Sequence, residues 1–291
     1  MHIPPLIAYL NGRFSPLDQL QVSVLDRGFL FGDGVYEMIP VYDRKVFRLG
    51  EHLQRLGSSL AAVRISNPHT EAQWREIILS LVEQQDFVDQ SVYLQVTRGV
   101  AFPRNHAFPA QVTPTVLVFA DPLDPPPQQL LEQGVSAVTS SDLRWLRCNI
   151  KATSLLANVL AKQLAVDEGV AETILLRDGL LIEGAASNIF IVQQGVIMAP
   201  AASHQMLSGI TYDLICELAR QHGLPLQLGM VSEQALRHAD EVWLTSSSKE
   251  LLAIVTLDGR PVGNGKIGPI YQAMYGFYQE FKTTVMRRGQ E

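Results

Sequence analysis

The chain has 291 residues, of which 47% are hydrophobic and 18% are charged, a composition typical of a globular protein with a substantial core. Its formal net charge of −6 and its lack of any basic run argue against nucleic acid as the main partner. Cys148 and Cys216 lie far apart and outside any metal-ligand spacing, which favours a reducing, cytoplasmic compartment. We find no secretory signal pattern and no apolar run near the ~20 residues that span a bilayer, so we expect no membrane partner.

The first 120 residues alternate between strand and helix patterns, which predicts a small α/β domain. Asn11-Gly12 predicts a type I′ hairpin turn. Pro40 predicts that the strand around it lies at a sheet edge or carries a bulge, because proline lacks the N–H of a ladder bond. We predict strands over residues 35–41, 45–49, 91–97 and 115–120, and helices over 51–63 and 70–85.

A proline-rich segment, residues 121–129, predicts a linker between two domains. Its four prolines continue neither a helix nor a central strand. From residue 130 to residue 291 we predict a larger α+β domain, in which Asp178-Gly179 marks another hairpin turn. We predict its strands over residues 173–176, 180–182, 187–192, 196–198 and 242–244, and its helices over 154–168, 211–222 and 270–287.

Lys151 and Glu183 are the most informative pair of charges in the sequence. Lys151 follows an apolar approach, residues 145–150, and Glu183 ends the apolar strand 180–182. An isolated charge is costly to bury, and apolar surroundings lower the pKa of a lysine and favour its free amine. The two residue types together fit pyridoxal 5'-phosphate (PLP), because an amine forms a Schiff base with its aldehyde and a carboxylate holds its ring nitrogen protonated. Taken singly, each residue is more typical of a solvated surface charge.

Two segments offer amides and hydroxyls to a phosphate. Residues 207–211 (LSGIT) open a predicted helix, where free amides and the helix dipole attract an anion. Residues 245–248 (TSSS) follow an apolar strand. Arg55, on the predicted helix 51–63, would add a charge-assisted contact. Each segment alone is also typical of a helix cap or a turn.

Four blocks of the sequence resemble the fold-type IV PLP enzymes, the class of branched-chain aminotransferase, aminodeoxychorismate lyase and D-amino acid aminotransferase. They are DRGFLFGDGVYE at 26–37, EHLQRL at 51–56, Lys151, and EGAASN at 183–188, in family order over nearly the whole chain. Within the class, the chain is most similar to the D-amino acid aminotransferases. That similarity rests on TRG at 97–99, PRNHAFP at 103–109 and RWLRCNIK at 144–151.

The resemblance implies a two-domain α+β fold, with a small α/β domain (1–120), the linker (121–129) and a large PLP-binding pseudo-barrel domain (130–291) that includes Lys151. It implies transamination between a D-amino acid, such as D-alanine, and a 2-oxo acid, in a homodimer without a metal. Lys151 would be the catalytic Schiff-base lysine, Glu183 would pair with the ring nitrogen and Leu207 would pack on the ring. The implied phosphate ligands are Arg55, Ile210, Thr211, Ser246 and Ser247, and the implied carboxylate ligands are Tyr36, Arg104 and His106, the last two from the neighbouring subunit.

The sequence departs from the family pattern at three places. Pro40 stands where the family has a lysine that lines the side-chain pocket, which predicts weaker acceptance of acidic substrates such as D-glutamate. The loop Gly99–Arg104 is one residue longer, and Ala185 and Ala186 replace serines, which leaves fewer cofactor contacts. The same fold also serves branched-chain L-amino acid aminotransferases, aminodeoxychorismate lyases and (R)-amine transaminases. A non-catalytic PLP-binding protein is disfavoured by the intact lysine and glutamate.

Overall fold

The computed structural model describes residues 6–289, which divide into two compact units. Unit 1 takes the described residues up to Asp124, together with Ile150–Leu155 and the residues from Thr284 onward. Unit 2 comprises Pro125–Asn149 and Leu156–Thr283. We expected Lys151 in the larger domain, but its segment belongs to unit 1, because its backbone bonds to a strand of that unit.

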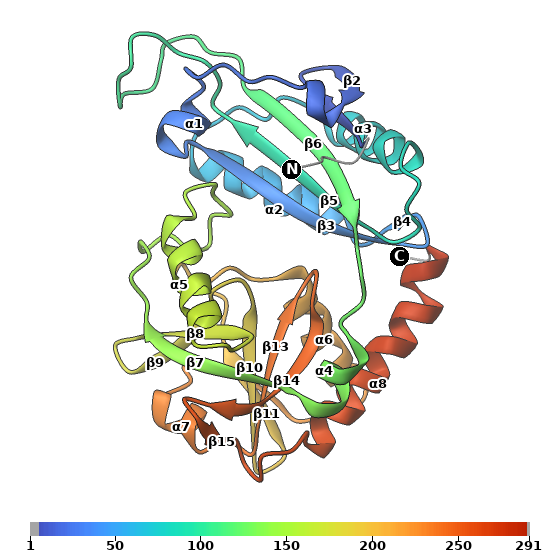
Figure 1. Cartoon of the computed structure of the whole chain (residues 1–291), viewed down its shortest axis with the longest axis vertical. Helices are drawn as coiled ribbons and strands as arrows, with labels where there is room; N and C mark the ends of the chain where they lie inside the picture. Colours follow the sequence, from blue (N-terminus) through green and yellow to red (C-terminus); the bar gives the residue numbers. More distant parts are fainter. Residues whose placement is uncertain (1–5, 290–291) are drawn as a thin grey trace. The chain divides into compact units, whose positions relative to one another are not determined.

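Unit 1 is built on a six-stranded antiparallel sheet in the order β2-β1-β6-β5-β3-β4 (Figure 1). Helices α2 and α3 run beside this sheet (Figure 1). They contribute core side chains together with the strands. The strands are β1 (Ile7–Leu10), β2 (Arg13–Pro16), β3 (Gly34–Tyr42), β4 (Lys45–Val46), β5 (Gln90–Thr97) and β6 (Thr115–Pro122). The helical segments are η1 (Leu17–Gln19), α1 (Arg27–Phe31), α2 (Leu49–Ala62), α3 (Glu71–Glu83) and η2 (Met286–Arg288).

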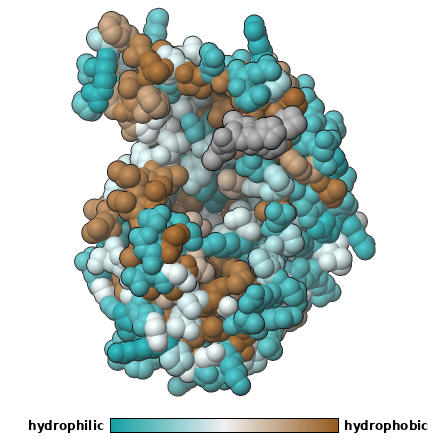
Figure 2. Space-filling view, viewed as in Figure 1, coloured by the Kyte–Doolittle hydropathy of each residue, from teal (hydrophilic) through white to brown (hydrophobic). Residues whose placement is uncertain are grey.

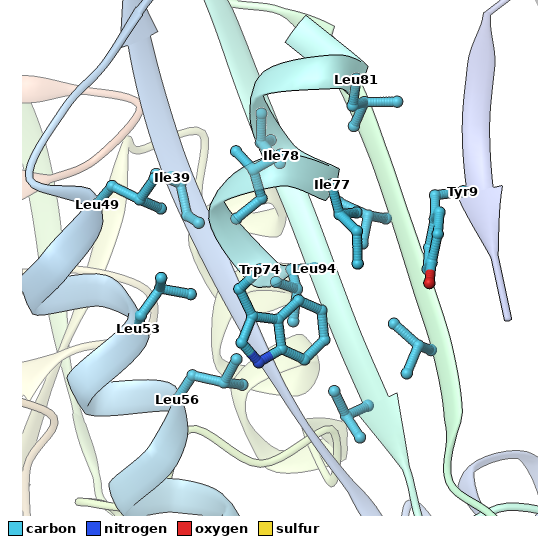
Figure 3. Close-up of a cluster of buried hydrophobic side chains, with 14 of the residues drawn as sticks. Tyr9, Ile39, Leu49, Leu53, Leu56, Trp74, Ile77, Ile78, Leu81 and Leu94 are labelled. Carbon is cyan, nitrogen blue, oxygen red and sulfur yellow. The ribbon is translucent and has the colours of Figure 1, made fainter. Parts of the chain in front are cut away.

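The core of unit 1 forms where the apolar faces of α2 and α3 meet one face of the sheet. Leu56 of α2 and Trp74 and Ile78 of α3 are buried against Ile39 and Leu94 of the strands (Figure 3). Side chains alternate between the two faces of a strand, so the residues of β3 next to the core residues lie on the other face. This alternation decides which polar side chains of β3 are buried and which are accessible.

Two local predictions for unit 1 have different outcomes. The Asn11-Gly12 turn is confirmed, since Leu10 pairs with Arg13 and both turn residues have positive φ, 49° and 95°. The prediction for Pro40 is confirmed in part: β3 carries no bulge against β5, but β4 pairs only with Val41 and Tyr42, so Pro40 lies outside that ladder, where the edge of β3 is free. The carbonyl of Pro40 accepts a bond from the Phe47 N–H at 2.9 Å on the β4 side. The position of the N–H that Pro40 lacks therefore faces the β4 side of β3. There β4 pairs only with Val41 and Tyr42, so no β4 ladder bond at Pro40 is lost.

Unit 2 is built on a nine-stranded mixed sheet in the order β12-β11-β10-β13-β14-β7-β8-β9, with β15 paired to β14. The sheet curls, so that β9 at one end contacts β10 and β11 (Figure 1), and the predicted pseudo-barrel is confirmed. The strands are β7 (Val135–Ser141), β8 (Glu172–Arg177), β9 (Leu180–Gly184), β10 (Asn188–Gln193), β11 (Val196–Pro200), β12 (Leu226–Gly229), β13 (Glu241–Ser246), β14 (Glu250–Leu257) and β15 (Arg260–Pro261). The helices are α4 (Gln128–Gln133), α5 (Leu156–Asp167), α6 (Ile210–Gln221), α7 (Glu233–Arg237) and α8 (Pro269–Thr284).

Residues 6–289 contain neither a membrane-spanning helix nor a metal-binding cluster. None of the helices described there is both long enough and apolar enough to cross a membrane. Within the same range, no group of three or more His, Cys, Asp or Glu side chains could hold a metal ion.

Candidate active site

Lys151 lies on a short segment that extends the free edge of β3. The Tyr36 N–H donates to the Lys151 carbonyl at 2.9 Å, and the Thr153 N–H donates to the Gly34 carbonyl at 3.0 Å. The Lys151 N–H donates to Ser59 Oγ of α2 at 3.3 Å. The Lys151 Nζ lies 4.3 Å from the centre of the Tyr36 ring, where the negative face of the ring attracts a cation. Unit 1 thus brings together two of the predicted site residues, the lysine and the tyrosine.

Glu37, the next residue along β3, points to the opposite face and is completely buried. It accepts two hydrogen bonds from Arg55, from Nε at 2.8 Å and from Nη2 at 2.7 Å, and its Oε2 lies 2.8 Å from His52 Nδ1. Burial alone would raise the pKa of Glu37, but the charge and hydrogen bonds of Arg55, with the hydrogen bond of His52, lower it to about 2. Glu37 therefore fixes the predicted phosphate ligand Arg55 by a two-bond ion pair.

His52 completes this cluster and leaves one polar atom without a partner. Burial lowers the pKa of His52, although Glu37 opposes the shift. Its Nε2 is buried and has no hydrogen-bond partner among the described residues. We did not predict Glu37 or His52 as site residues, although Glu37 ends the quoted motif DRGFLFGDGVYE and His52 lies in EHLQRL. Their burial as charged or polar residues becomes visible only once α2 is packed on β3.

Arg104 and His106 lie on the exposed loop of residues 98–114, between β5 and β6. The Arg104 guanidinium carbon lies 4.4 Å from the centre of the Phe31 ring, and the His106 ring centre lies 5.3 Å from it. Within the described part of unit 1 we find no hydrogen bond or ring contact from either residue to Tyr36 or Lys151. A single copy of unit 1 therefore does not assemble the predicted carboxylate ligands into one cluster.

Glu183 anchors the candidate site residues of unit 2. It lies on β9, only 5% exposed, and one of its oxygens accepts a hydrogen bond from Arg144 Nη1. Its Oε2 accepts from the Leu207 N–H at 3.1 Å and from Asn188 Nδ2 at 3.4 Å. Arg144 binds two carboxylates, because its Nε and Nη2 also donate to Asp142 at 2.9 Å each.

The pKa of Glu183 is raised to about 7, because its burial outweighs the opposing charge and hydrogen bond of Arg144. Near neutral pH the carboxylate therefore needs a further cation to stay fully ionised. A protonated ring nitrogen would supply that charge. Arg144 was not among our predicted site residues, although it begins the quoted motif RWLRCNIK.

The predicted phosphate ligands of unit 2 come from two neighbouring segments. The helix α6 begins at Ile210, and its N-cap, Gly209, provides no side-chain cap, so the first-turn amides are not capped by a side chain. A Cβ added at Gly209 would lie 2.4 Å from Asn188 Oδ1, so any larger residue there would displace the Asn188 side chain. The same Asn188 pairs with Thr245 in the β10–β13 ladder, which brings the end of β13 to this place.

The end of β13 also has unused hydrogen-bonding capacity. Thr245 Oγ1 is buried and has no partner among the described residues. Ser246 follows as the last residue of β13, and its Oγ accepts from the Lys249 N–H at 3.1 Å. Ser247 is the next residue of the turn and is half-buried. Hydroxyls and uncapped amides are the donors that a phosphate group requires.

The donor set of the two units fits PLP by its chemistry: an amine, a ring-nitrogen partner, and hydroxyl, amide and guanidinium groups for a phosphate. Unit 1 holds Lys151, Tyr36, Arg55, Arg104 and His106, and unit 2 holds Glu183, Leu207, Ile210, Thr211, Ser246 and Ser247.

Comparisons with known proteins agree with this chemistry. Residues 34–257 match the family model described as amino-transferase class IV. The chain is 40% identical to the D-alanine aminotransferase of Bacillus licheniformis over 260 residues, which cover 89% of this chain and 91% of that relative. It is 36% identical to the D-alanine aminotransferase of Staphylococcus haemolyticus over 274 residues, 94% and 96% of the two chains. Its structure is similar to that of the branched-chain amino acid aminotransferase of Escherichia coli, with a TM-score of 0.89, 27% identity and coverage of 95% and 94%.

Proposed function

Because the chain belongs to the amino-transferase class IV family, we propose that it uses PLP to transfer the amino group of a D-amino acid, such as D-alanine, to a 2-oxo acid. The predicted family and the fold-type IV architecture are confirmed. The observation that carries the proposal is the buried Glu183, held by Arg144 and the Leu207 N–H, with a pKa near 7 that a protonated ring nitrogen would lower.

The choice of a D-amino acid over a branched-chain L-amino acid rests on the degree of similarity. The relatives named D-alanine aminotransferase share 36–40% identity with the chain over most of its length, whereas a branched-chain aminotransferase of very similar structure shares 27%. The higher identity over most of the chain favours the D-alanine group. The branched-chain activity is the second candidate, because that structural similarity favours it.

The residues of the chain have distinct roles in this proposal. Bound PLP supplies an electron sink for the electrons left when the substrate loses its α-proton. The Lys151 amine would hold PLP through its aldehyde group, and the same amine would move the proton at the substrate α-carbon. Glu183 would hold the ring nitrogen in its protonated form. The remaining ligands hold the cofactor in place: Leu207 against the ring, and Arg55, Ile210, Thr211, Ser246 and Ser247 around the phosphate.

The substrate carboxylate is bound by Tyr36, Arg104 and His106 in this proposal. An arginine fork suits a carboxylate, and a tyrosine hydroxyl adds a hydrogen bond. Pro40 lies on the same face of β3 as Tyr36, four residues along the strand, and it is buried. It offers no charge to an acidic side chain, so we expect D-alanine to be a better substrate than D-glutamate.

We further propose that the enzyme is a homodimer in which Arg104 and His106 act in the partner's site. Their loop is flanked by exposed apolar side chains, because Val100 pairs with Asp26 and so lies beside the segment of Val24 and Phe29. Phe102 of the loop is 82% exposed. A surface of Val24, Phe29, Val100 and Phe102 around two charged residues is typical of a protein interface.

A second apolar surface lies on α5 (Figure 2). Leu156, Val159 and Leu160 are 58–73% exposed and share one face of this helix by their spacing. A second copy of the chain would cover such a face. We also place the enzyme in the cytoplasm, where the free and buried Cys148 and Cys216 would stay reduced.

A substrate panel tests the proposed function. D-alanine, L-leucine, aminodeoxychorismate and (R)-phenylethylamine are each offered to the PLP-loaded enzyme, the amines with pyruvate or 2-oxoglutarate. We expect D-alanine to give the highest kcat/KM of the four compounds. A preference for L-leucine would assign the branched-chain activity instead, and pyruvate release from aminodeoxychorismate would assign the lyase.

A further inference from the structure

Phe31 contacts Arg104 and His106 of the exposed loop. The Arg104 guanidinium lies over its ring at 4.4 Å, and the His106 ring lies 5.3 Å away at a tilt of 45°. The Arg27 guanidinium lies 4.7 Å from the same ring centre. Arginine is attracted to the face of an aromatic ring by the quadrupole of the ring. One half-buried ring thus forms a platform for Arg104 and His106.

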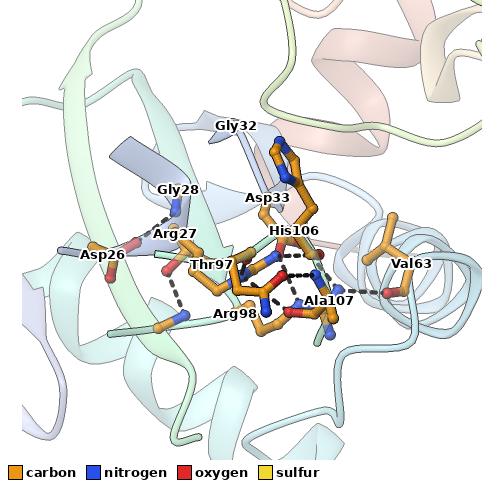
Figure 4. Close-up of polar contacts among 12 residues, drawn as sticks. Asp26, Arg27, Gly28, Gly32, Asp33, Val63, Thr97, Arg98, His106 and Ala107 are labelled. Carbon is orange, nitrogen blue, oxygen red and sulfur yellow. Dashed lines mark hydrogen bonds and ion pairs between the residues drawn. The ribbon is translucent and has the colours of Figure 1, made fainter. Parts of the chain in front are cut away.

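Arg27 holds the backbone of the same loop from inside the unit. It is 4% exposed and donates to the carbonyl oxygens of Asn105 at 2.5 Å, His106 at 3.2 Å and Ala107 at 3.4 Å (Figure 4). Its Nε donates to Asp33 at 2.7 Å. A single guanidinium therefore binds three consecutive carbonyls of the loop while a carboxylate fixes its own orientation.

Arg98 ties this cluster to the core. It donates to both oxygens of Asp33, at 2.7 and 3.0 Å, and to the carbonyls of Val63 and Arg64 just after α2 (Figure 4). Its guanidinium also lies 3.7 Å from the centre of the Phe108 ring, in the middle of the loop. Burial would raise the pKa of Asp33, but the hydrogen bonds of Arg98 and Arg27 outweigh it, so the pKa is lowered and the link stays charged.

We propose that Phe31 and Arg27 are positioning residues that hold Arg104 and His106 ready for the substrate carboxylate, Phe31 through the side chains and Arg27 through the backbone. This inference rests on the proposed function, which makes Arg104 and His106 carboxylate ligands. These contacts all come from side chains of the same unit, so the protein's own residues hold the loop. A preorganised arginine loses less conformational entropy when the carboxylate arrives, which raises affinity.

The test separates the ring of Phe31 from its volume. Phe31→Leu removes the ring, Phe31→Tyr keeps it, and Phe14→Leu makes the same change at a 37% exposed ring of β2 as a matched control. Arg27→Lys keeps the charge but cannot bind Asp33 and three carbonyls together. The PLP-loaded variants are compared in kcat and KM for D-alanine, in the inhibition constant of propionate, and in the rate of trypsin cleavage after Arg104.

We expect Phe31→Leu and Arg27→Lys to raise the KM for D-alanine and the propionate inhibition constant about three- to thirtyfold, the range of a cation–π contact, with little change in kcat. Trypsin should cleave after Arg104 several times faster. Phe31→Tyr and Phe14→Leu should behave as wild type. If Arg27→Lys does not fold, the Phe31 variants decide the question alone.

Two outcomes would overturn the inference in different ways. An unchanged propionate constant and an unchanged cleavage rate in Phe31→Leu, in an enzyme that turns over D-alanine, would refute the positioning role alone. A wild-type enzyme that neither uses D-alanine nor is inhibited by propionate would refute the proposed function, and the positioning role with it.

Discussion

At the scale of single residues, the two predicted cofactor ligands, Lys151 and Glu183, have different surroundings. Lys151 Nζ lies 4.3 Å from the centre of the Tyr36 ring, whose negative face attracts a cation. Glu183 is buried deeply enough that its pKa rises to about 7 in spite of Arg144. A carboxyl group with a pKa near 7 changes its ionisation strongly when one positive charge is added beside it. Loss of the Glu183 carboxylate should therefore affect the rate of proton transfer more than the affinity for PLP.

Replacing Lys151 with alanine should abolish the covalent bond to PLP and reduce transamination at least about a hundredfold, because the acid–base group is lost with it. The bond is measured by borohydride reduction followed by mass spectrometry of the peptide that contains residue 151. Lys45→Ala, at an exposed lysine of β4, is the control. A reduced PLP adduct on another lysine of the Lys151→Ala protein would assign the role elsewhere.

Replacing Glu183 with glutamine should slow removal of the α-proton on the order of a hundredfold, while the affinity for PLP changes far less. A neutral amide does not stabilise a protonated ring nitrogen, so stabilisation of the transition state is lost rather than binding. Single-turnover kinetics with D-alanine, together with a PLP titration, separate the two effects. Equal single-turnover rates in the variant and the wild type would remove Glu183 from the proposed mechanism.

At the scale of secondary structure, consecutive residues of β3 point to opposite faces of the sheet. Tyr36 points toward Lys151, and Glu37 points into the core, where it holds Arg55 and His52 of α2. The helix position is set by buried apolar contacts such as Leu53 and Leu56 against the sheet. The packing of α2 on β3 thus places the predicted phosphate ligand Arg55 beside its counter-ion, Glu37.

The low pKa of Glu37 predicts a pH dependence of stability. The pKa is about 2 in the folded protein, below the ordinary value of 4.5, so the stabilisation is present above pH 4.5 and is lost as the pH falls toward 2. We expect the excess stability of the wild type over Glu37→Gln to shrink by about 1–2 kcal/mol between pH 6 and pH 3.5. Urea unfolding at several pH values measures this.

A matched control for this prediction is Glu71→Gln. Glu71 pairs with Arg75 at 2.8 Å on the surface of α3, where an ion pair contributes little. Its substitution should leave the pH dependence nearly unchanged. A constant difference between wild type and Glu37→Gln across the pH range would contradict the buried ion pair as its source.

At the scale of the whole molecule, we propose that a second copy of the chain completes the site. Arg104 and His106 are exposed and lie against Phe31 rather than against Tyr36 or Lys151. Val100 and Phe102 of their loop are exposed, and Val100 pairs with Asp26 in the segment that carries the exposed Val24 and Phe29. Both observations favour a dimer in which each subunit completes the site of the other.

A mixed dimer tests this arrangement directly. One subunit carries Lys151→Ala and the other Arg104→Ala, and differently tagged subunits allow the mixed dimer to be purified. If Arg104 acts across the interface, both lesions fall on one site, and the other site keeps its own Lys151 and a wild-type Arg104 from its neighbour. We expect about half of the wild-type activity, although each homodimer is weak. The loss in the Arg104→Ala homodimer should be about ten- to a hundredfold, the cost of a charge-assisted hydrogen bond.

Activity of the mixed dimer no higher than that of the Arg104→Ala homodimer would place Arg104 in the site of its own subunit or outside any site. A monomeric wild-type protein that retains full activity would contradict the dimer altogether.

The features that the sequence determined by itself are those with local causes. The Asn11-Gly12 and Asp178-Gly179 turns follow from residues that accept positive φ, and the helices α2 and α6 follow from their apolar periodicity. The family and the fold class follow from short motifs, each of which is continuous in the chain.

Only the tertiary structure decided which distant residues meet. Arg144 reaches Glu183 across 39 positions, Glu37 reaches His52 and Arg55 only when α2 packs on β3, and Arg27 reaches the loop carbonyls from nearly 80 positions away. Lys151 joins unit 1 because its backbone completes the free edge of β3. Such contacts depend on strand register and helix packing, which no local pattern encodes, because their free energy comes from the burial of side chains far apart in the chain.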